Sequence, residues 1–390
     1  MKKEIVEFIK YNKIFLAIYR LFAGGLIVFL KLFIRVKKKK VLFMSFGGKK
    51  YDDSPKALYE TIKNDDFFKD YKFVWAFYEP EKYNVVDCKK VKVDSLRYYF
   101  EALSAGVWVT NSSMERGLKL KREKQIEFNT WHGTPLKKMG EDIHNKAYTA
   151  KSRKKIGKTI YCSQSEYDKE IFTKLFSTNA DNVIISDLPR NDSLLNYSKE
   201  KILALKKELS IPLEKKVILY APTFREYERD SFNACYLAPP IDLLKWEACL
   251  GEEYVLLFRA HYEIVNVLGV KDNSFVKNVS SYHCLNDLIA VSDLLISDYS
   301  SIYFDYAITG KPMLNFSYDL DVYKEKRGLY LDLGQELKCA INTNEDTLLG
   351  EIQNLEWDKC SENTKHFAEK FAPKAGHACE LVIEKMKQVL

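Results

Sequence analysis

The fold class of this chain is set by residues 41–62, which read VLFMSFGGKKYDDSPKALYETI. The first six of these residues form a short apolar run that is typical of a buried strand, and Gly47-Gly48 ends it. Ser54-Pro55 then supplies an N-cap and a first helical residue, which predicts a helix as far as Ile62. A buried strand followed at once by a helix is the unit from which parallel α/β sheets are built.

The same alternation continues on both sides of Pro189. Before it we expect strands at 73–77, 107–110, 126–131 and 159–162, and helices at 95–103 and 166–175. After it we expect strands at 217–220, 254–258, 294–297 and 312–316, helices at 198–209, 285–291 and 301–308, and a helical tail from about 362. This pattern predicts two Rossmann-like halves, with ligands bound at the carboxyl ends of the strands. The expected divisions are an N-terminal region at 1–40, a first domain at 41–195, and a second domain with a C-terminal helix at 196–390.

Composition excludes several classes of protein. With 46% hydrophobic and 29% charged residues, the 390-residue chain buries large cores and is not a disordered tail. The net charge of +7 is dispersed, which argues against a dedicated nucleic-acid binder. A mean hydropathy of −0.30 excludes a polytopic membrane protein. The eight cysteines stand singly and form no CxxC pair, which favours reduced thiols in a cytosolic protein.

Residues 1–40 have a different character. The run 14–36 is mostly apolar but is interrupted by three basic residues, Arg20, Lys31 and Arg35. Its longest uninterrupted apolar stretch, 21–30, is short for a spanning helix, which needs about 20 apolar residues. We therefore favour an amphipathic helical region at 4–36 in the membrane interface, followed by four lysines, 37–40, suited to anionic lipid. A buried helical hairpin and a true span are the alternatives.

The first candidate catalytic residue is His132, at the end of the expected strand 126–131. Gly133 allows a tight turn after it, and Thr134-Pro135 predicts the cap and first turn of a following helix. An imidazole that titrates near about 6.5 acts as a base toward a hydroxyl at neutral pH. The alternative is a histidine that only forms a hydrogen bond within its turn.

Three further strand ends carry polar side chains. Arg259 and His261 follow the strand 254–258 with a spacing that puts both on one face, and a guanidinium with an imidazole suits a diphosphate. Thr223 and Arg225 follow the strand 217–220. Asp298 ends the strand 294–297, and Ser300-Ser301 opens a helix whose hydroxyl and N–H groups suit a phosphate. The alternatives are a salt-bridged or surface arginine and ordinary helix capping.

Other motifs are weak or missing. The triplet Asp319-Leu320-Asp321 matches the DxD pattern of metal-dependent sugar transferases, but acidic triplets of this kind are common. Asp52-Asp53 suits either contact with an acceptor or a solvated turn. The sequence holds no GxxxxGK[ST], HExxH or GxSxG, which excludes kinase, metalloprotease and hydrolase assignments by motif.

Taken in order, these strings resemble the CDP-glycerol glycerophosphotransferase family, which makes the poly(glycerol phosphate) or poly(ribitol phosphate) of bacterial teichoic acids and some capsules. The resemblance covers roughly residues 41–380. It rests on Ser45-Phe46-Gly47-Gly48 with Asp53-Ser54-Pro55, 131–137, Pro189-Arg190-Asn191-Asp192, 221–225, Arg259-Ala260-His261, 297–301 and Arg327-Gly328. The chain departs from the family pattern at Asp187, where a Gly is usual, at Tyr262, where a Pro is usual, and at Ala375-Gly376, in place of Asp-Gly.

The resemblance implies a GT-B-like fold of two Rossmann-type domains behind a membrane-associating helical N-terminus. It implies transfer of an alditol phosphate, from CDP-glycerol or CDP-ribitol, to a lipid-linked saccharide or a growing teichoic acid or capsule polymer, with release of CMP. The family's two important histidines correspond to His132 and His261. We expect His132 to act as general base, and the substrates to contact Gly133, Thr134, Thr223, Arg225, Arg259, Asp298, Ser300, Ser301 and Arg327.

On this interpretation no metal or cofactor is obligatory, and the enzyme acts as a peripheral protein on the cytoplasmic face of the cell membrane. Its partners are the donor, the acceptor and an anionic membrane surface, without nucleic acid, and a homo-oligomer is compatible with the motifs. One alternative is a nucleotide-sugar glycosyltransferase of the same fold, which would release a nucleoside diphosphate. Another is a catalytically silent membrane-bound scaffold, which the paired histidine motifs argue against.

Overall fold

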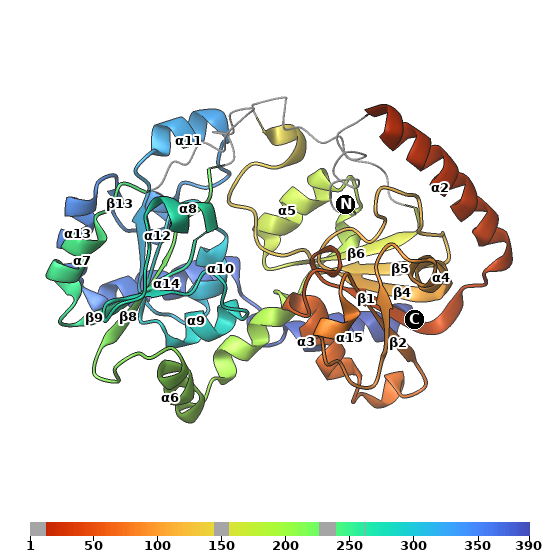
Figure 1. Cartoon of the computed structure of the whole chain (residues 1–390), viewed down its shortest axis with the longest axis horizontal. Coiled ribbons are helices and arrows are strands. Elements are labelled where there is room, and N and C mark those ends of the chain that lie inside the picture. Colours follow the sequence, from red (N-terminus) through yellow and green to blue (C-terminus); the bar gives the residue numbers. More distant parts are fainter. Residues whose placement is uncertain (1–12, 144–155, 226–238, 261) are drawn as a thin grey trace.

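The computed structural model describes residues 13–143, 156–225, 239–260 and 262–390, which fold into two α/β halves that lie side by side (Figure 1). The first half contains a seven-stranded sheet in the order β3-β2-β1-β4-β5-β6-β7. Its strands are β1 Lys37–Met44, β2 Lys72–Phe77, β3 Lys89–Lys92, β4 Ala105–Thr110, β5 Ile126–Asn129, β6 Lys158–Ser163 and β7 Val183–Ile185. Its main helices are α2 Lys13–Phe33, α3 Asp53–Ile62, α4 Leu96–Ser104 and α5 Glu166–Leu175.

The second half repeats this topology with a six-stranded sheet in the order β10-β9-β8-β11-β12-β13. The strands are β8 Lys216–Ala221, β9 Tyr254–Phe258, β10 Val276–Asn278, β11 Leu294–Ser297, β12 Met313–Phe316 and β13 Ile341–Asn342. The helices are α6 Lys199–Glu208, α7 Leu243–Leu250, α8 Tyr262–Val267, α9 Leu285–Val291, α10 Ile302–Ala307, α11 Leu320–Lys326, α12 Leu333–Leu337, α13 Glu345–Gln353, α14 Trp357–Phe371 and α15 Ala378–Val389.

Every strand pair in both sheets is parallel. The predicted α/β class and its parallel sheets are therefore confirmed. In each sheet the strand order reverses next to the first strand, between β1 and β4 and again between β8 and β11. Such a reversal opens a crevice at the carboxyl ends of the strands, where ligands of open α/β sheets bind. A ligand-binding site is therefore expected at these two crevices.

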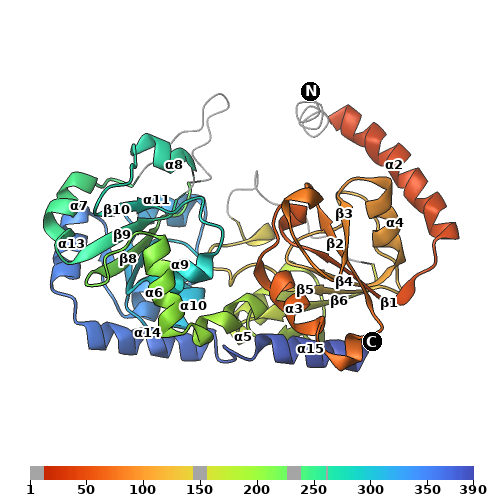
Figure 2. The ribbon, with the colours of Figure 1, turned by 60° about the horizontal axis from the view of Figure 1, so that its bottom comes forward.

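The last helix, α15, lies against the first half. Its buried side chains Val382, Ile383 and Met386 belong to the apolar cluster that also holds Val41 and Ile62. Figure 2 shows α14 and α15 running in succession beneath both halves. The sequence division placed this helix in the second domain. It packs on the first because its buried stripe fits beside α3, and Lys387 donates to Asp65 at 2.6 Å there.

The four lysines 37–40, expected to suit anionic lipid, are partly engaged within the protein. They form the beginning of β1, and the side chain of Lys40 is buried and paired with Glu101. Lys39 pairs with Asp70 at 3.0 Å. Because two of the four charges already have partners within the protein, the cluster has less charge to offer to lipid.

Helix α2 is amphipathic, with one face on the protein and one in solvent. Ile27 is buried, and Ala23, Leu30 and Ile34 pack on the same cluster of the first half. Lys31 fixes the helix by donating to the carbonyl oxygens of Lys119 and Lys121, at 2.7 and 3.3 Å. The opposite face exposes Leu21, Phe22, Val28, Phe29, Leu32 and Phe33. Among the helices that the structure describes, none has the length and apolar character needed to cross a membrane.

Candidate active site

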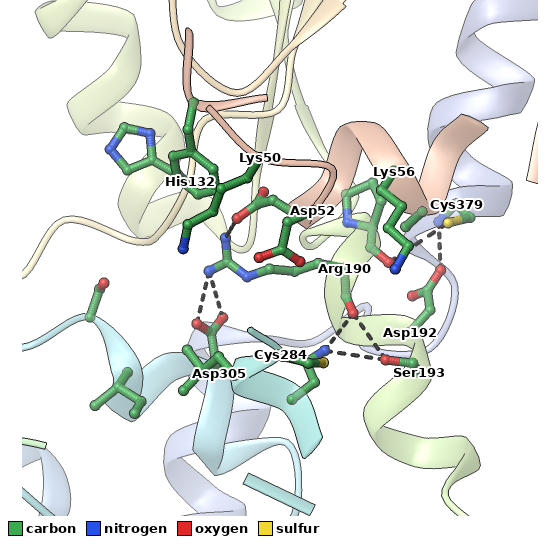
Figure 3. Close-up of a pocket in the computed structure, with 18 of the residues that line it drawn as sticks. Lys50, Asp52, Lys56, His132, Arg190, Asp192, Ser193, Cys284, Asp305 and Cys379 are labelled. Atoms are coloured by element: carbon green, nitrogen blue, oxygen red, sulfur yellow. Dashed lines mark hydrogen bonds and ion pairs between the residues drawn. The ribbon is translucent and has the colours of Figure 1, made fainter. Parts of the chain in front are cut away.

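A cavity of about 700 Å³ lies between the two halves, beyond the carboxyl ends of their central strands. Figure 3 shows that charged side chains dominate its lining. The first half contributes Phe46, Lys50, Asp52, Asp53, Lys56 and His132, the connection between the halves contributes Arg190, Asp192 and Ser193, and the second half contributes Pro222, Arg259, Cys284, Ser300, Ser301 and Asp305. Four residues chosen from the sequence therefore meet at one site: His132, Arg259, Ser300 and Ser301.

His132 lies three residues beyond β5, and its geometry leaves one ring nitrogen open. Nδ1 lies 2.8 Å from the carbonyl oxygen of Asn111. Because a carbonyl oxygen can only accept, Nδ1 carries the proton in this contact and Nε2 keeps its lone pair. The imidazole also stacks on Trp131, with ring centroids 4.3 Å apart. The ring is thus held at one nitrogen and one face, while Nε2 is available to take a proton.

The segment after His132 is not a helix, so that expectation is wrong. Thr134 is buried, and its hydroxyl donates to Gln164 at 2.6 Å instead of capping a helix. The chain continues into an antiparallel bridge between Lys137 and Leu329 of the other half. Contacts between the halves therefore determine the conformation here, although a Thr-Pro pair favours a helix. The buried hydroxyl of Thr134 instead holds the loop that carries His132.

The backbone around the cavity is held in unfavourable conformations. Phe46, Asp53 and Trp131 have φ values of 46°, 65° and 52°, in the left-handed region that non-glycine residues avoid. Each such residue costs about 1–3 kcal/mol and persists only where its surroundings enforce it. At Phe46 the constraint comes from Asn111, whose side chain accepts from the N–H of Phe46 at 2.8 Å while its carbonyl oxygen contacts His132. Strain gathered in this way is typical of a functional site.

The second half provides a wall suited to anions. Arg259 follows β9, and its Nη1 donates to the carbonyl oxygens of Val279 and Tyr282 at 3.1 and 3.0 Å. Burial lowers the pKa of Arg259, while the nearby Asp52 opposes that effect. Carbonyl partners fix the guanidinium without neutralising it, so its positive charge remains available to a ligand. Ser300, on the same wall, accepts from the N–H of Ile302 at 3.2 Å.

Gly133 brings the two walls together. A Cβ atom at this position would lie 2.7 Å from the hydroxyl oxygen of Ser301 and 3.2 Å from its Cβ. Only a glycine permits this approach without a shift of one wall. The segment that carries His132 and Gly133 therefore lies directly against Ser301 of the other half.

Thr223, Arg225 and Asp298 form an interior network. Arg225 is 1% exposed and pairs with Asp298 at 2.8 Å and with Asp319 at 2.7 Å. Its guanidinium also lies over the ring of Tyr299, 5.0 Å from the centroid. Asp298 accepts from the N–H of Thr223 at 2.9 Å. None of the three is among the residues that line the cavity, whereas their neighbours Ala221, Pro222 and Ser300 are.

Arg327 also lies away from the cavity. It donates to the carbonyl oxygen of Lys138, next to hydrogen bonds from Lys138 to Gly328 at 3.0 Å and from Tyr330 to Leu136 at 2.9 Å. This second strip joins the two halves. Arg327 therefore contributes to the contact between the two halves.

Arg190 is one of the charged residues of the cavity that sequence reasoning missed. Its guanidinium pairs with Asp53 of α3 at 2.8 Å and with Asp305 of α10 at 2.8 Å. Burial acts to lower the pKa of Arg190, but Asp305 and Asp53 raise it above its usual value. Asn191 also donates to Asp305, at 2.7 Å. The signal was present in the string Pro189-Arg190-Asn191-Asp192, which was used only for the resemblance.

Behind the His132 loop lies a buried carboxyl group without a cationic partner, that of Asp187. It accepts from Gln164 at 3.0 Å and from the N–H of Leu188, while its second oxygen has no partner among the described residues. Burial, with Asp305 and Asp168 nearby, raises the pKa of Asp187 to about 7. An ionised carboxylate is therefore disfavoured in the folded protein.

Asp187 should make stability depend on pH. Its pKa of about 7 in the folded state exceeds the unfolded value of about 3.9, so its stabilisation is complete below about pH 4 and is lost as pH rises through 7. Each pKa unit is worth about 1.4 kcal/mol. In the wild type the free energy of unfolding should therefore fall by about 2–4 kcal/mol between pH 4 and pH 8 because of Asp187, and Asp187→Asn should remove this part of the fall. Urea unfolding at both pH values measures it. Equal declines in the wild type and the variant would contradict the prediction.

Two expectations remain without a structural outcome. His261 lies outside the described residues. Among the residues that are described, no group of three or more histidine, cysteine, aspartate or glutamate side chains is arranged to hold a metal ion.

Comparison with known proteins gives one consistent answer. The family model "CDP-Glycerol:Poly(glycerophosphate) glycerophosphotransferase" matches residues 26–384. A teichoic acid poly(glycerol phosphate) polymerase of Staphylococcus epidermidis is 37% identical over 82% of this chain, and a teichoic acid glycerol-phosphate transferase of Staphylococcus aureus is 34% identical over 82% of this chain. The chain spans 46% of the length of the first relative and 84% of the second.

A solved structure agrees in fold and in sequence. The wall teichoic acid polymerase TagF, in a histidine-to-asparagine variant soaked with CDPG, is similar with a TM-score of 0.77 and 32% identity. The match covers 90% of this chain and 89% of the solved one. The likeness thus includes both halves.

Proposed function

The chain belongs to the CDP-glycerol glycerophosphotransferase family, and on that premise we propose that it transfers an alditol phosphate from a CDP-alditol to a lipid-linked saccharide or a growing teichoic acid or capsule polymer, releasing CMP. The observation that carries the proposal is the meeting, in one cavity, of an imidazole with a free Nε2 and a wall with the Arg259 guanidinium and two serines. The first suits an acceptor hydroxyl, and the second suits a diphosphate.

In the proposed reaction, Nε2 of His132 takes the proton of the acceptor hydroxyl. The acceptor oxygen forms a bond to the phosphorus that carries the alditol, and the bond from that phosphorus to the bridging oxygen breaks. CMP leaves with that oxygen and its electron pair. Charge stays on phosphoryl oxygens throughout, so positioning and electrostatic stabilisation are the main contributions of the protein.

Arg259, Ser300 and Ser301 are the proposed contacts of the donor diphosphate. They come from the ends of β9 and β11 in the second half, opposite His132. A guanidinium gives charge-assisted hydrogen bonds to phosphate oxygens, and the serine hydroxyls add neutral donors. Asp298 and Arg225 act behind this wall, by holding the loop from which Ser300 projects. His261 stays a proposed partner of the diphosphate.

A donor panel tests the proposal. Purified protein is given CDP-glycerol or CDP-ribitol with a short saccharide acceptor, and CMP release and product mass are measured. We favour glycerol, so CDP-glycerol should add one glycerol phosphate per CMP released. Release of a nucleoside diphosphate from a sugar nucleotide would indicate the glycosyltransferase instead, and no turnover with any donor would indicate a scaffold.

Helix α2 supports a peripheral position on the membrane, which we place on the cytoplasmic face. Its outer face exposes two adjacent apolar stripes, which include Phe22 at 75% and Leu32 at 77% exposure. A patch of this kind on a helix tethered to the enzyme suits the headgroup boundary of a bilayer. Because Lys39 and Lys40 pair within the protein, apolar burial should contribute more to binding than the lysine cluster does.

A single substitution on this face should weaken membrane binding. Burying a phenylalanine side chain is worth about 1.5–3 kcal/mol, so Phe22→Ser should reduce binding to lipid vesicles about ten-fold or more. Sedimentation with vesicles of phosphatidylglycerol and phosphatidylcholine measures it. The control is Leu213→Ser, which removes an exposed side chain far from α2 and should change nothing. Unchanged binding of Phe22→Ser would remove α2 from the proposal.

A further inference from the structure

Behind the His132 loop, three buried polar side chains form a hydrogen-bonded relay that takes no direct part in the proposed reaction. Oδ1 of Asp187 accepts from Nε2 of Gln164 at 3.0 Å, and Oε1 of Gln164 accepts from the hydroxyl of Thr134 at 2.6 Å. All three residues are at most 1% exposed. Direct contacts therefore link Asp187, which lies just after β7, to the residue that follows Gly133.

The carboxyl group of Asp187 determines which end of the Gln164 amide faces Thr134. Oδ1 accepts a hydrogen bond whether the carboxyl group is ionised or carries its proton on Oδ2, so it turns the NH2 end of the amide toward itself. The carbonyl end must then face Thr134 and accept from its hydroxyl. Oδ2 of Asp168 lies 3.3 Å from the same hydroxyl oxygen, so a flipped amide would turn the hydroxyl toward Asp168 instead.

The backbone at both ends of the relay leaves little room for adjustment. Asp187 has a φ of 64°, in the left-handed region that favours glycine, and its sequence position is one where a Gly is usual in the family. Such strain persists only where the surroundings enforce it. At the other end, a Cβ atom on Gly133 would lie 2.7 Å from the hydroxyl oxygen of Ser301 in the second half. A shift of the segment 132–134 would therefore change its contact with Ser301 at once.

We propose that Asp187 is a positioning residue for the proposed general base, acting through Gln164 and Thr134. The inference rests on the proposed function, in which His132 takes the proton of the acceptor hydroxyl. The carbonyl oxygen of Asn111 holds the imidazole ring, and the relay constrains the backbone that follows it. A displacement of about 1 Å at a reacting group costs up to about a hundred-fold in rate, so this constraint matters for turnover.

Two substitutions separate the carboxyl group of Asp187 from its backbone conformation. Asp187→Gly suits the φ of 64° but removes the acceptor of Gln164, whereas Asp187→Asn keeps an Oδ1 that accepts. With CDP-glycerol and a short saccharide acceptor, Asp187→Gly should lower kcat about ten- to a hundred-fold. The KM for CDP-glycerol should stay unchanged, because the donor wall belongs to the other half. Asp187→Asn should keep a near-wild-type kcat.

Ser210→Gly is the matched control for the glycine substitution. Ser210 also has a left-handed backbone, with a φ of 54°, but it is exposed and lies just after α6 in the second half. Its replacement should change neither kcat nor KM. Near-wild-type kcat in Asp187→Gly, or a kcat in Asp187→Asn as low as in Asp187→Gly, would overturn the proposal.

A double-mutant cycle tests whether Asp187 acts through the relay. Thr134→Val removes the hydroxyl and nearly keeps the shape of the side chain, so it should lower kcat about as much as Asp187→Gly does. Combining the two substitutions should cause little further loss, because both break the same relay. Losses that multiply would show that Asp187 acts by another route and would contradict the inference.

Hydrogen exchange makes the test independent of turnover. In the peptide 129–137, the amide hydrogens of Asp187→Gly should exchange faster than those of the wild type, whereas Asp187→Asn and Ser210→Gly should match the wild type. Equal exchange in the wild type and Asp187→Gly would count against the relay. If the wild type releases no CMP from CDP-glycerol, the proposed function fails, and the exchange rates still decide whether Asp187 holds this segment.

Discussion

Replacing His132 with alanine should lower kcat by about 10²–10⁴-fold, the range that general-base catalysis contributes. The substitution removes the only imidazole that the described lining of the cavity contains, and with it the proposed base Nε2. Turnover with saturating CDP-glycerol and acceptor measures the effect as CMP release. The KM for CDP-glycerol should change little, because a base acts on the acceptor and the donor wall is intact.

Folding should survive this substitution, since the ring is exposed and contributes one hydrogen bond to Asn111. A thermal melt checks that point. Arg259→Ala is the informative counterpart, because it should raise the KM for the donor about ten- to a hundred-fold while leaving the base in place. Near-wild-type kcat in His132→Ala would show that another group takes the proton, and the base assignment would then be wrong.

His132 and Arg259 could be found from sequence because of a property of parallel sheets. A short apolar run defines a buried strand, and the residue after it must lie at the carboxyl edge, where all such residues of one sheet gather. The strands β5, β9 and β11 carry this signal plainly, as Leu256 and Ile296 illustrate with complete burial. The edge strands β3 and β10 do not, because β3 exposes Lys89 and Lys92 and β10 has only three residues, of which one is apolar. Core strands were therefore predicted and edge strands were missed.

Arg225 illustrates what the sequence does not contain. It follows a strand just as Arg259 does, and the two look alike from their own neighbourhoods. Their difference lies in residues far along the chain: Arg225 forms ion pairs with Asp298 and Asp319, whereas the hydrogen bonds of the Arg259 guanidinium to described residues go to the carbonyl oxygens of Val279 and Tyr282. Which partner an arginine finds depends on tertiary packing, and that partner decides whether the guanidinium is structural or available to a ligand.

The helix expected after Thr134 failed for a related reason. A Thr-Pro pair is a good local helix start, but residues 136–138 hydrogen-bond to residues 328–330 of the other half. Those bonds require an extended segment. Contacts between the halves thus determine the backbone conformation of the segment that carries Gly133. They cannot be predicted from local sequence patterns, because those patterns describe each half separately.

Arg190 should dominate the stability of the contact between the halves. Its guanidinium is 12% exposed, and the carboxylates of Asp53 and Asp305 that it joins are 7% and 3% exposed. Arg190→Ala leaves two buried negative charges facing each other without a cation. Breaking a buried pair from one side typically costs about 3–5 kcal/mol, so we expect a loss of this size in urea unfolding. Lys82→Ala, which removes an exposed pair with Glu79, is the control and should cost less than about 1 kcal/mol.

The cause of that loss can be separated from lost packing. In Arg190→Ala the cost comes from repulsion between Asp53 and Asp305, so adding Asp305→Asn should restore part of the stability even though it removes a further charge. Asp305 belongs to α10, whose preceding residues are Ser300 and Ser301, and Asp53 opens α3 next to Lys56. Weakening this ion pair should therefore also raise the KM for both substrates, because α3 of the first half and α10 of the second half would both lose a contact that fixes their position at the cavity. If Arg190→Ala unfolds no more easily than Lys82→Ala, the ion pair of Arg190 with Asp53 and Asp305 does not hold the two halves together.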